Sequence, residues 1–242
     1  GMIEMDKKQL LANWPKLERG LERMASFLDS QRVFDEARLP TNAVLAVIAA
    51  AYELIPDHGD FLAKAEKLLR RYLWSAFFTD RYENTAASRA FADFKAIKAL
   101  LRKPGFTDSE LATVPALNRT EFPLADVDSL MAAGWPKAAG IEARAILAVS
   151  TYLGAIDFAD HKPATYDSIH KREYHHVFPD ALLSEAGIPS YLALNCALIT
   201  WKTNRMIGRK DPLEYLQERV QWANQDVVRE RLKSHVISVD LL

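Results

Sequence analysis

The sequence predicts a mainly α protein, a helical bundle that carries a small ββα insert near its C-terminal end. Two observations support this fold class. Through residue 161, apolar side chains recur at the spacing of amphipathic helices, with proline and glycine between the stretches. From Tyr166 onward, two short apolar runs typical of strands alternate with short helical patterns. We therefore expect a helical domain over residues 2–161 and a smaller domain with C-terminal helices over 162–242.

Each helix of the first domain is predicted from an apolar stripe and from a proline, glycine or capping residue near one end. Pro15 is tolerable in the first turn of the first helix, and Pro56 and Gly59 mark a turn after the second. Ser88 is a candidate N-cap of the fourth helix. In order, the expected helices cover residues 15–28, 42–55, 61–78, 88–101 and 141–152. The four prolines within residues 104–140 indicate loops and short helices that pack over the bundle.

The C-terminal domain is expected to alternate strands with short helices. Gly187 is a candidate C-cap, and Pro212 fits the first turn of a helix. In order, the expected elements are a strand over 172–178, one or two helical turns over 180–186, a strand over 196–200, a short helix over 203–207, a helix from Pro212 and a last helix from about Asp226.

Composition excludes several classes of protein. No apolar run reaches the roughly 18 uncharged residues that a membrane span needs, and no basic-then-apolar signal pattern opens the chain. We therefore expect a cytoplasmic protein without a membrane partner. The single cysteine, Cys196, excludes an internal disulfide and a multi-cysteine zinc site. It is expected to be a small apolar residue of a buried strand and not a nucleophile.

The net charge of −1 conceals two basic stretches. Residues 64–103 contain 10 Lys and Arg against 4 Asp and Glu, a surplus of six positive charges. A second run, from Lys202 to Lys210, has four basic residues and no acid between them. Basic stripes on an otherwise neutral protein are typical of surfaces that bind a phosphate backbone. The alternative is that these charges only solvate helix faces.

The candidate site is carried by two adjacent histidines and two asparagines. His175 and His176 end the first strand, Asn195 precedes the second strand, and Asn204 lies in the helix that follows it. Hydrolysis of a phosphodiester needs a base for the attacking water, a cation for the phosphoryl oxygens and help for the departing oxygen. The residue types and their spacing are those of a one-metal nuclease site.

Each of these residues has an expected role. Strand alternation sends the two histidines to opposite sides, so we expect the strand to break at Pro179 and let both serve one site. His176 is then the general base, and His175 binds the metal together with the amide oxygen of Asn204. Asn195 supports catalysis by tying the loop between the strands and holding the backbone of the base. The phosphate-binding candidates are the basic residues around Asn204, namely Lys202, Arg205, Arg209 and Lys210.

These residues resemble a known family. Residues 175–179, 194–200 and 203–216 resemble the C-terminal HNH-like, or ββα-metal, domain of GmrSD-type restriction endonucleases. The second and third segments also look like the HNH domain of the RNA-guided CRISPR nuclease. The first domain is similar to the helical linker of the GmrSD-type proteins at residues 71–78, 81–83, 88–89 and 93.

The resemblance implies a metal-dependent DNA endonuclease of a restriction or phage-defence system, with DNA as its partner and one divalent ion, Mg²⁺, Mn²⁺, Zn²⁺ or Ni²⁺, as its cofactor. Relatives in that family carry a nucleotide-hydrolysing domain with an Asp-Gly-Gln-Gln-Arg motif, which this sequence lacks. A nucleotide-hydrolysing domain or subunit is therefore an expected partner. HNH proteins often have an acid where His175 stands, and an imidazole favours Zn²⁺, Ni²⁺ or Mn²⁺ more than a carboxylate would.

Two alternatives to a nuclease stay open. The first is a non-catalytic nucleic-acid-binding or regulatory module with a degenerate HNH-like site, and the second is a structural helical adaptor. The histidine pair alone would also fit an ordinary strand, with one ring buried and one exposed. Two further histidines, His58 and His235, are expected to be exposed. Three aromatic residues of one basic helix, Trp74, Phe77 and Phe78, are expected to pack in the core and not to stack on bases.

Overall fold

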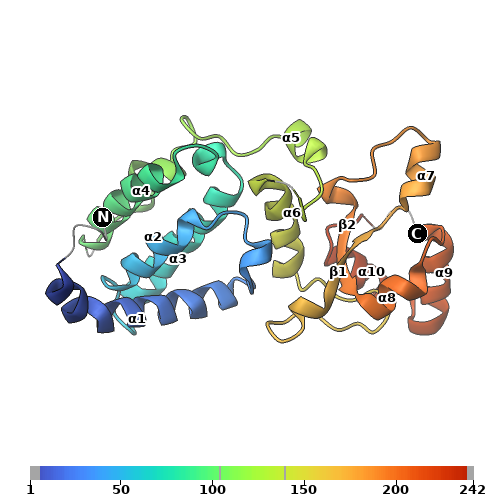
Figure 1. Ribbon diagram of the computed structural model, residues 1–242, viewed down its shortest axis with the longest axis horizontal. Helices are drawn as coiled ribbons and strands as arrows, with labels where there is room; N and C mark the ends of the chain where they lie inside the picture. Colours follow the sequence, from blue (N-terminus) through green and yellow to red (C-terminus); the bar gives the residue numbers. More distant parts are fainter. Residues whose placement is uncertain (1–5, 104, 139, 239–242) are drawn as a thin grey trace. The chain divides into compact units, whose positions relative to one another are not determined.

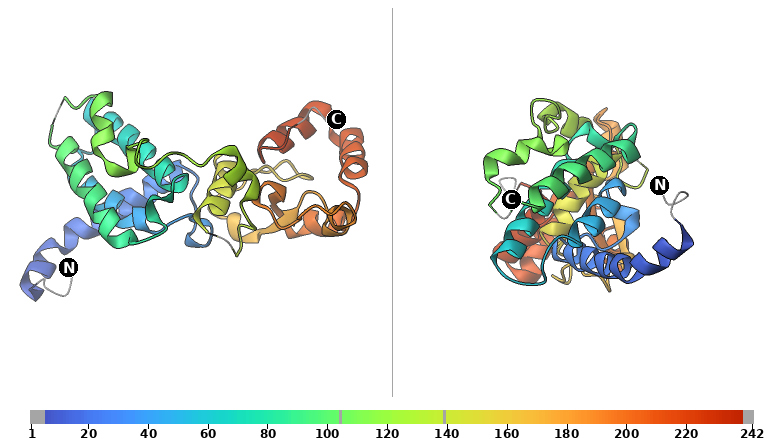
Figure 2. Two further views of the ribbon diagram at one scale, coloured as in Figure 1. Left: turned by 90° about the horizontal axis from the view of Figure 1, so that it is seen from above. Right: turned by 90° about the vertical axis from the view of Figure 1, so that its left-hand side faces the viewer.

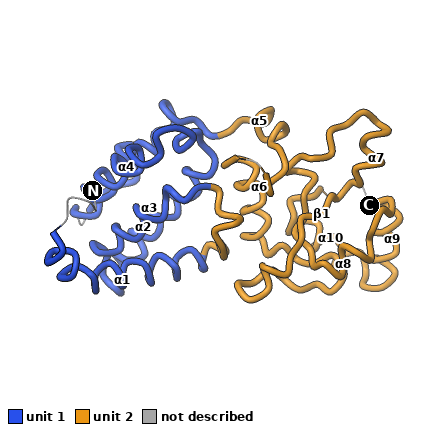
Figure 3. The backbone as a smooth tube through the Cα atoms, viewed as in Figure 1, with its two compact units in different colours: residues 1–30, 41–124 blue, residues 31–40, 125–242 orange. Residues whose placement is uncertain are grey.

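The computed structural model describes residues 6–103, 105–138 and 140–238. It confirms a mainly helical fold with a small two-stranded antiparallel sheet towards the C-terminal end (Figure 1). The chain forms two compact units, which Figure 3 distinguishes by colour. Unit 1 contains residues 1–30 and 41–124, and unit 2 contains residues 31–40 and 125–242. The expected boundary after residue 161 falls inside unit 2, because the helix over 141–152 packs against a strand of the sheet.

Unit 1 is built around a short apolar helix. α2 (Ala43–Tyr52) contacts both α1 (Lys7–Ser30) and α4 (Ala86–Leu101), and Figures 1 and 2 show α1 lying alongside it. Val44, Ile48 and Ala51 of α2 are fully buried. Gly20 permits the close approach of α1, since a Cβ there would lie 2.7 Å from the carbonyl oxygen of Ala49. α1 begins eight residues before Pro15, so the expected start of this helix is too late.

The rest of unit 1 is α3 (Asp60–Phe77), η3 (Asp80–Tyr82), η4 (Asp108–Thr113) and η5 (Pro115–Leu117). Asp93 of α4 is fully buried and binds three elements together. It accepts hydrogen bonds from the Arg81 guanidinium at 3.0 Å, the Tyr82 hydroxyl at 2.6 Å and the backbone N–H of Ala116 at 3.1 Å. Phe77 is buried as expected.

Unit 2 holds the sheet. It contains η2 (Glu36–Arg38), α5 (Val127–Ala132), α6 (Ile141–Tyr152), η6 (Ile169–Lys171), β1 (Arg172–His176), α7 (Asp180–Glu185), η7 (Ala193–Asn195), β2 (Cys196–Thr200), α8 (Trp201–Ile207), α9 (Pro212–Ala223) and α10 (Gln225–Lys233). α6 and β2 have the bounds that the sequence predicts, whereas β1 ends two residues earlier, at His176. The strands are antiparallel, with His175 opposite Ala197 and His176 opposite Cys196.

The two faces of the sheet pack against different helices. Ala197 and Ile199 belong to one apolar cluster with Ile207, Tyr215 and residues of α10. Cys196 and Leu198 belong to another cluster, which includes Leu147 of α6. The buried β2 strand therefore separates the C-terminal helices from α6. Residues directly opposite in an antiparallel pair share a face, so His175 faces α8 to α10 and His176 faces α6.

A buried carboxylate joins the sheet to α8. Asp157 accepts hydrogen bonds from the backbone N–H of Thr200 at 2.7 Å and from the hydroxyl of Thr203 at 2.6 Å, and it lies 3.7 Å from the Arg172 guanidinium. Burial alone would raise the pKa of Asp157, but the hydrogen bonds that it accepts lower the pKa below its usual value. Thr200 is also the N-cap of α8. The first turn of the helix that carries Asn204 is thus fixed from two sides.

Three other expectations about individual residues can be compared with the structure. His235 was expected to be exposed, but it is buried, because the chain after α10 folds back onto residues 156–158. His58 is exposed as expected. Cys196 is buried in β2, and burial raises the pKa of its thiol to about 12, which agrees with an apolar role.

Among the helices of the described ranges, none combines the length and apolar character needed to cross a membrane.

Candidate functional site

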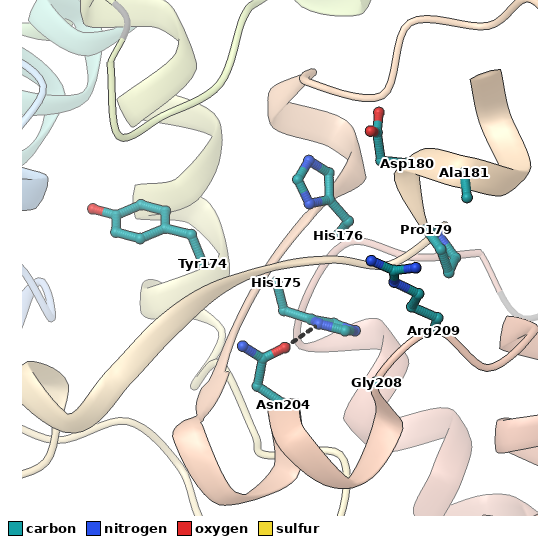
Figure 4. A pocket seen from close by; sticks show the side chains of 9 residues that line it. All are labelled: Tyr174, His175, His176, Pro179, Asp180, Ala181, Asn204, Gly208 and Arg209. Atoms are coloured by element: carbon teal, nitrogen blue, oxygen red, sulfur yellow. Dashed lines mark hydrogen bonds between the residues drawn. The ribbon is translucent and has the colours of Figure 1, made fainter.

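His175 and Asn204 are in direct contact. His175 extends from the face of β1 that meets α8, and Asn204 lies in the middle of α8. The Nδ1 atom of His175 and the Oδ1 atom of Asn204 are 2.7 Å apart, and Figure 4 shows the ring directed at the amide. The His175 side chain is buried, and burial lowers its pKa, although the contact with Asn204 opposes this shift. The imidazole is therefore neutral at neutral pH and retains a lone pair.

His176 projects to the other side of β1. Its ring stacks on Trp135, with centroids 4.1 Å apart and an interplanar angle of 16°, and it meets Tyr191 edge to face at 4.7 Å. The Nε2 atom is buried and has no hydrogen bond to the described residues. Burial lowers the pKa of His176, while the nearby Asp180 opposes the shift. The ring is therefore neutral at neutral pH and able to accept a proton.

Asn195 joins the backbone at the end of β1 to the loop before β2. Its Oδ1 accepts a hydrogen bond from the N–H of Phe178 at 2.8 Å. Its amide group donates to the carbonyl oxygens of Phe178, at 3.0 Å, and Ser190, at 2.9 Å. Asn195 is buried and its side chain makes these bonds to backbone atoms. The backbone two residues beyond His176 is held in place by this amide.

One open pocket of about 370 Å³ connects the two histidines. It is lined by β1, by the first residues of α7 and by the C-terminal end of α8. His175, His176 and Asn204 all line it, together with Arg209 and Asp180 (Figure 4). Strand alternation keeps the histidine rings on opposite sides of β1, and the pocket wraps around the end of the strand. A phosphate group bound in this pocket therefore meets side chains from both faces of β1.

The four basic candidates lie in different surroundings. Arg209 lines the pocket. Arg205 is exposed and lies over the Trp201 ring, 5.2 Å from its centroid. Lys202 is also exposed, whereas the ammonium group of Lys210 donates to both carboxylate oxygens of Glu218 at 2.7 and 2.8 Å. The structure thus brings only Arg209 of this set to the histidines.

The sequence argument missed several residues of the site. Glu173 accepts a hydrogen bond from the Asn204 amide at 2.7 Å, and Asp157 fixes the start of α8. Trp135 comes from a loop far from the histidine pair in sequence. Glu173 could have been found, because alternation places residues 173 and 175 on one face of β1. Trp135 has no such sequence signal, since its contact with His176 depends on how two loops fold.

The residues around His175 fit a divalent ion that keeps water ligands. The His175 ring and the Asn204 amide are in contact, with Nδ1 and Oδ1 2.7 Å apart, and both side chains line an open pocket, where one ion can reach them. A neutral imidazole and an amide oxygen are both suitable ligands for a divalent ion. No cluster of three or more His, Cys, Asp or Glu side chains that could hold a metal occurs in the described part of the chain. An ion here would therefore depend on one histidine, one amide and water.

Comparison with known proteins gives little information about activity. No family model matches the chain, and no solved structure matches it. The chain is 25% identical, over 191 residues, to an uncharacterised protein of the archaeon Methanocaldococcus jannaschii. The aligned region covers 72% of this chain and 30% of the archaeal protein. The chain thus matches less than a third of the length of that relative.

Proposed function

We propose that the chain is a metal-dependent DNA endonuclease of restriction or phage-defence type, which hydrolyses phosphodiester bonds at the pocket around the end of β1. One observation carries this proposal. His175, Asn204 and His176 line the same pocket as Arg209, and His175 contacts Asn204 directly. These are the residue types that hydrolysis of a phosphodiester needs. DNA as the substrate rests on the resemblance of residues 171–216 to HNH domains.

In this proposal His175 and Asn204 hold the divalent ion. The ion, when bound, supplies positive charge to the phosphoryl oxygens. The lowered pKa of His175 keeps its ring neutral and able to ligate. The contact with α8, whose first turn Asp157 fixes, keeps the two side chains together before any ion arrives.

His176 acts as the base that takes a proton from the attacking water. Its Nε2 is enclosed by protein, so we assign the proton transfer to Nδ1. The lowered pKa leaves the ring unprotonated at neutral pH. Asn195 keeps the backbone beyond His176 in place through Phe178. Arg209 at the pocket edge binds a phosphate oxygen of the substrate.

A plasmid nicking assay with Mg²⁺, Mn²⁺, Zn²⁺ and Ni²⁺ tests the proposal. His176→Ala should reduce the single-turnover rate by about 10²–10⁴-fold, the usual contribution of a general base, and should leave metal binding unchanged. His175→Ala should weaken metal binding, and a higher metal concentration should restore part of its activity. Exposed His170 provides the control, since His170→Ala should cleave like the unchanged protein. Full activity of His176→Ala would remove this motif from the reaction.

The second candidate is a nucleic-acid-binding module without catalysis. The observation that favours it is the exposed pair of Arg205 and Trp201 on α8, next to Lys202, since such a surface binds a phosphate backbone without any chemistry. Titration with Mn²⁺ followed by calorimetry separates the two candidates. A nuclease of this type takes up one ion per chain, whereas a binding module has no need of it.

The partner expected from the resemblance, a nucleotide-hydrolysing domain or subunit, is also part of the proposal. The chain matches 30% of the length of its archaeal relative, which leaves room for further domains in that protein. Cleavage that appears only after a nucleoside triphosphatase subunit is added would support this partnership. The proposed site of action is the cytoplasm, where invading DNA would be met.

A further inference from the structure

The His176 ring is in contact with two aromatic side chains from separate loops. Trp135 covers one face of the ring, with an interplanar angle of 16°, and Tyr191 meets it at 84°. Trp135 and Tyr191 also contact each other edge to face, with centroids 5.7 Å apart. The three rings therefore form a closed cluster in which every pair is in contact. We call this set the aromatic cage.

The backbone on both sides of the aromatic cage is pinned. Gly134 and Leu192, the neighbours of Trp135 and Tyr191, form an antiparallel β-bridge. The N–H of Ala193 donates to the carbonyl oxygen of Ala133 at 2.8 Å. Before Tyr191, the carbonyl of Ser190 accepts the hydrogen bond from Asn195. The loops that carry the two rings are thus held to each other and to the end of β1.

In His176, contact with the aromatic cage takes the place of the hydrogen bond that orients most catalytic histidines. In such residues the nitrogen that does not react usually bonds to a carboxylate or carbonyl, which fixes the ring. In His176 the buried Nε2 has no such bond to the described residues. The torsion of a histidine ring about its second side-chain bond is broad. Stacking is therefore the interaction that restricts this ring.

We infer that Trp135, assisted by Tyr191, is a positioning residue that holds the His176 ring in the orientation in which its Nδ1 meets the attacking water. This inference rests on the proposed function, and its structural part is tested separately. Trp135 also lies against Tyr174, with ring centroids 6.5 Å apart, but within the described residues its ring contacts include neither His175 nor Asn204. Its route to the proposed base is therefore the stacked His176 ring.

The test compares Trp135→Leu, which removes the stacked ring, with Trp135→Phe, which keeps an aromatic face. The first measurement is the proton NMR spectrum of His176 in the metal-free protein. The ring current of Trp135 shifts the stacked His176 protons upfield. Trp135→Leu should abolish this shift, and Trp135→Phe should retain part of it. Trp222→Leu is the matched control, because Trp222 is 82% exposed and its ring lies beside the Arg219 guanidinium, 6.0 Å from it, and not beside His176.

The second measurement is the single-turnover cleavage rate with Mn²⁺, together with the affinity for Mn²⁺. Trp135→Leu should cleave about 10- to 100-fold more slowly, the scale expected for a misplaced catalytic group, with Mn²⁺ affinity within twofold of the unchanged protein. Trp135→Phe should recover most of the rate. A merely structural role for Trp135 would lower the rate and the Mn²⁺ affinity together.

Two results would overturn the inference. One is an unchanged His176 spectrum in Trp135→Leu, and the other is a lost ring-current shift with a normal cleavage rate. If Trp135→Leu does not fold, Tyr191→Ala replaces it, since Tyr191 is 59% exposed, and the same shift and rate are measured. If the unchanged protein cleaves DNA with none of the ions, the proposed function fails, and the NMR comparison still decides whether Trp135 stacks on His176.

Discussion

At the scale of single residues, the Asn204 amide determines how the His175 ring is protonated. An ionised carboxylate only accepts hydrogen bonds, so the group of Asn204 that lies 2.7 Å from Glu173 has to be its NH₂. The amide oxygen then faces His175, whose Nδ1 must carry a proton to bond to it at 2.7 Å. Since the ring is neutral, the lone pair lies on Nε2. Figure 4 shows that edge of the ring turned away from Asn204, on the side of the pocket where Arg209 lies.

This chain of hydrogen bonds predicts that Glu173→Ala changes the tautomer of His175. Without the carboxylate the amide is free to turn and offer its NH₂ to Nδ1, which leaves the proton on Nε2. Nitrogen NMR of the metal-free protein distinguishes the two tautomers. Mn²⁺ affinity should also fall about 10-fold, the scale of losses when a residue that supports a ligand is removed.

Two further variants complete this prediction. Glu173→Gln should retain part of the original tautomer, because its amide oxygen can accept the same hydrogen bond. Glu185→Ala, at an exposed glutamate of α7, should change neither the tautomer nor the affinity. A Nδ1 proton that persists in Glu173→Ala would show that Asn204 holds its orientation without the carboxylate.

His235 supplies a second prediction, about stability and pH. Its ring is buried, its Nε2 lies 3.1 Å from the carbonyl oxygen of Ile156, and burial lowers its pKa to about 4. An unfolded chain protonates this histidine near pH 6.5. The unfolded state therefore binds the extra proton first as the pH falls, so stability is lost between about pH 6.5 and pH 4, by up to about 3 kcal/mol.

Urea unfolding at a series of pH values measures this loss. His235→Gln can still donate to Ile156 but does not titrate, so its stability should vary less between pH 6.5 and pH 4. His58→Gln is the control, because His58 is exposed and should leave the pH dependence unchanged. Equal slopes for the unchanged protein and His235→Gln would mean that other groups cause the acid sensitivity.

At the scale of elements, the sequence predicts β2 and α6 well and the site only in part. β2 is a short apolar run and α6 has apolar residues at helical spacing, and the burial of both leaves few alternatives. Both have the expected bounds. The alternation of β1 correctly indicates that His175 and His176 face opposite ways. The contact between Trp135 and His176 could not be predicted, because two irregular loops and an isolated β-bridge create it.

The attachment of α8 to the sheet gives a third prediction, on Asp157→Ala. This change leaves the Arg172 guanidinium buried without its carboxylate and frees Thr200 and Thr203. A broken buried ion pair costs about 3–5 kcal/mol of stability. Because α8 carries Asn204, Mn²⁺ affinity should fall as well, even at temperatures where the variant is folded.

Thermal and urea unfolding, followed by Mn²⁺ titration, test this prediction. Asp160→Ala is the matched control, since Asp160 belongs to the same loop but is exposed. It should lose less than about 1 kcal/mol, as most surface substitutions do. A stability loss in Asp157→Ala with normal metal affinity would show that α8 keeps its place without this carboxylate.

At the scale of the whole molecule, the count of basic residues overstates the charge available to DNA. The ten basic residues in 64–103 include Arg81, which is buried and paired with Asp93. Arg71 lies 3.1 Å from the carboxylate of Asp108. In the other run, Lys210 is occupied by Glu218. Sequence alone gives the charges but not their partners, so it could not separate free cations from paired ones.

The last prediction uses this difference to test the DNA surface. Each phosphate contact adds roughly 0.9 to the slope of log affinity against log salt concentration on duplex DNA. A triple variant that combines Lys202→Ala, Arg205→Ala and Arg209→Ala removes three cations together. It should therefore reduce the slope by about 2.7. Lys210→Ala is the control from the same run and should change the slope by much less, because its charge is held by Glu218.

Fluorescence anisotropy of a labelled duplex at several salt concentrations measures these slopes. Affinity that hardly varies with salt in the unchanged protein would favour the structural adaptor. An equal effect of Lys210→Ala and of a single change at Arg209 would mean that DNA breaks the ion pair with Glu218. If the triple variant keeps a steep slope, the DNA contact lies elsewhere than on α8. The exposed cations of unit 1, such as Lys95 and Arg102, are then the candidates.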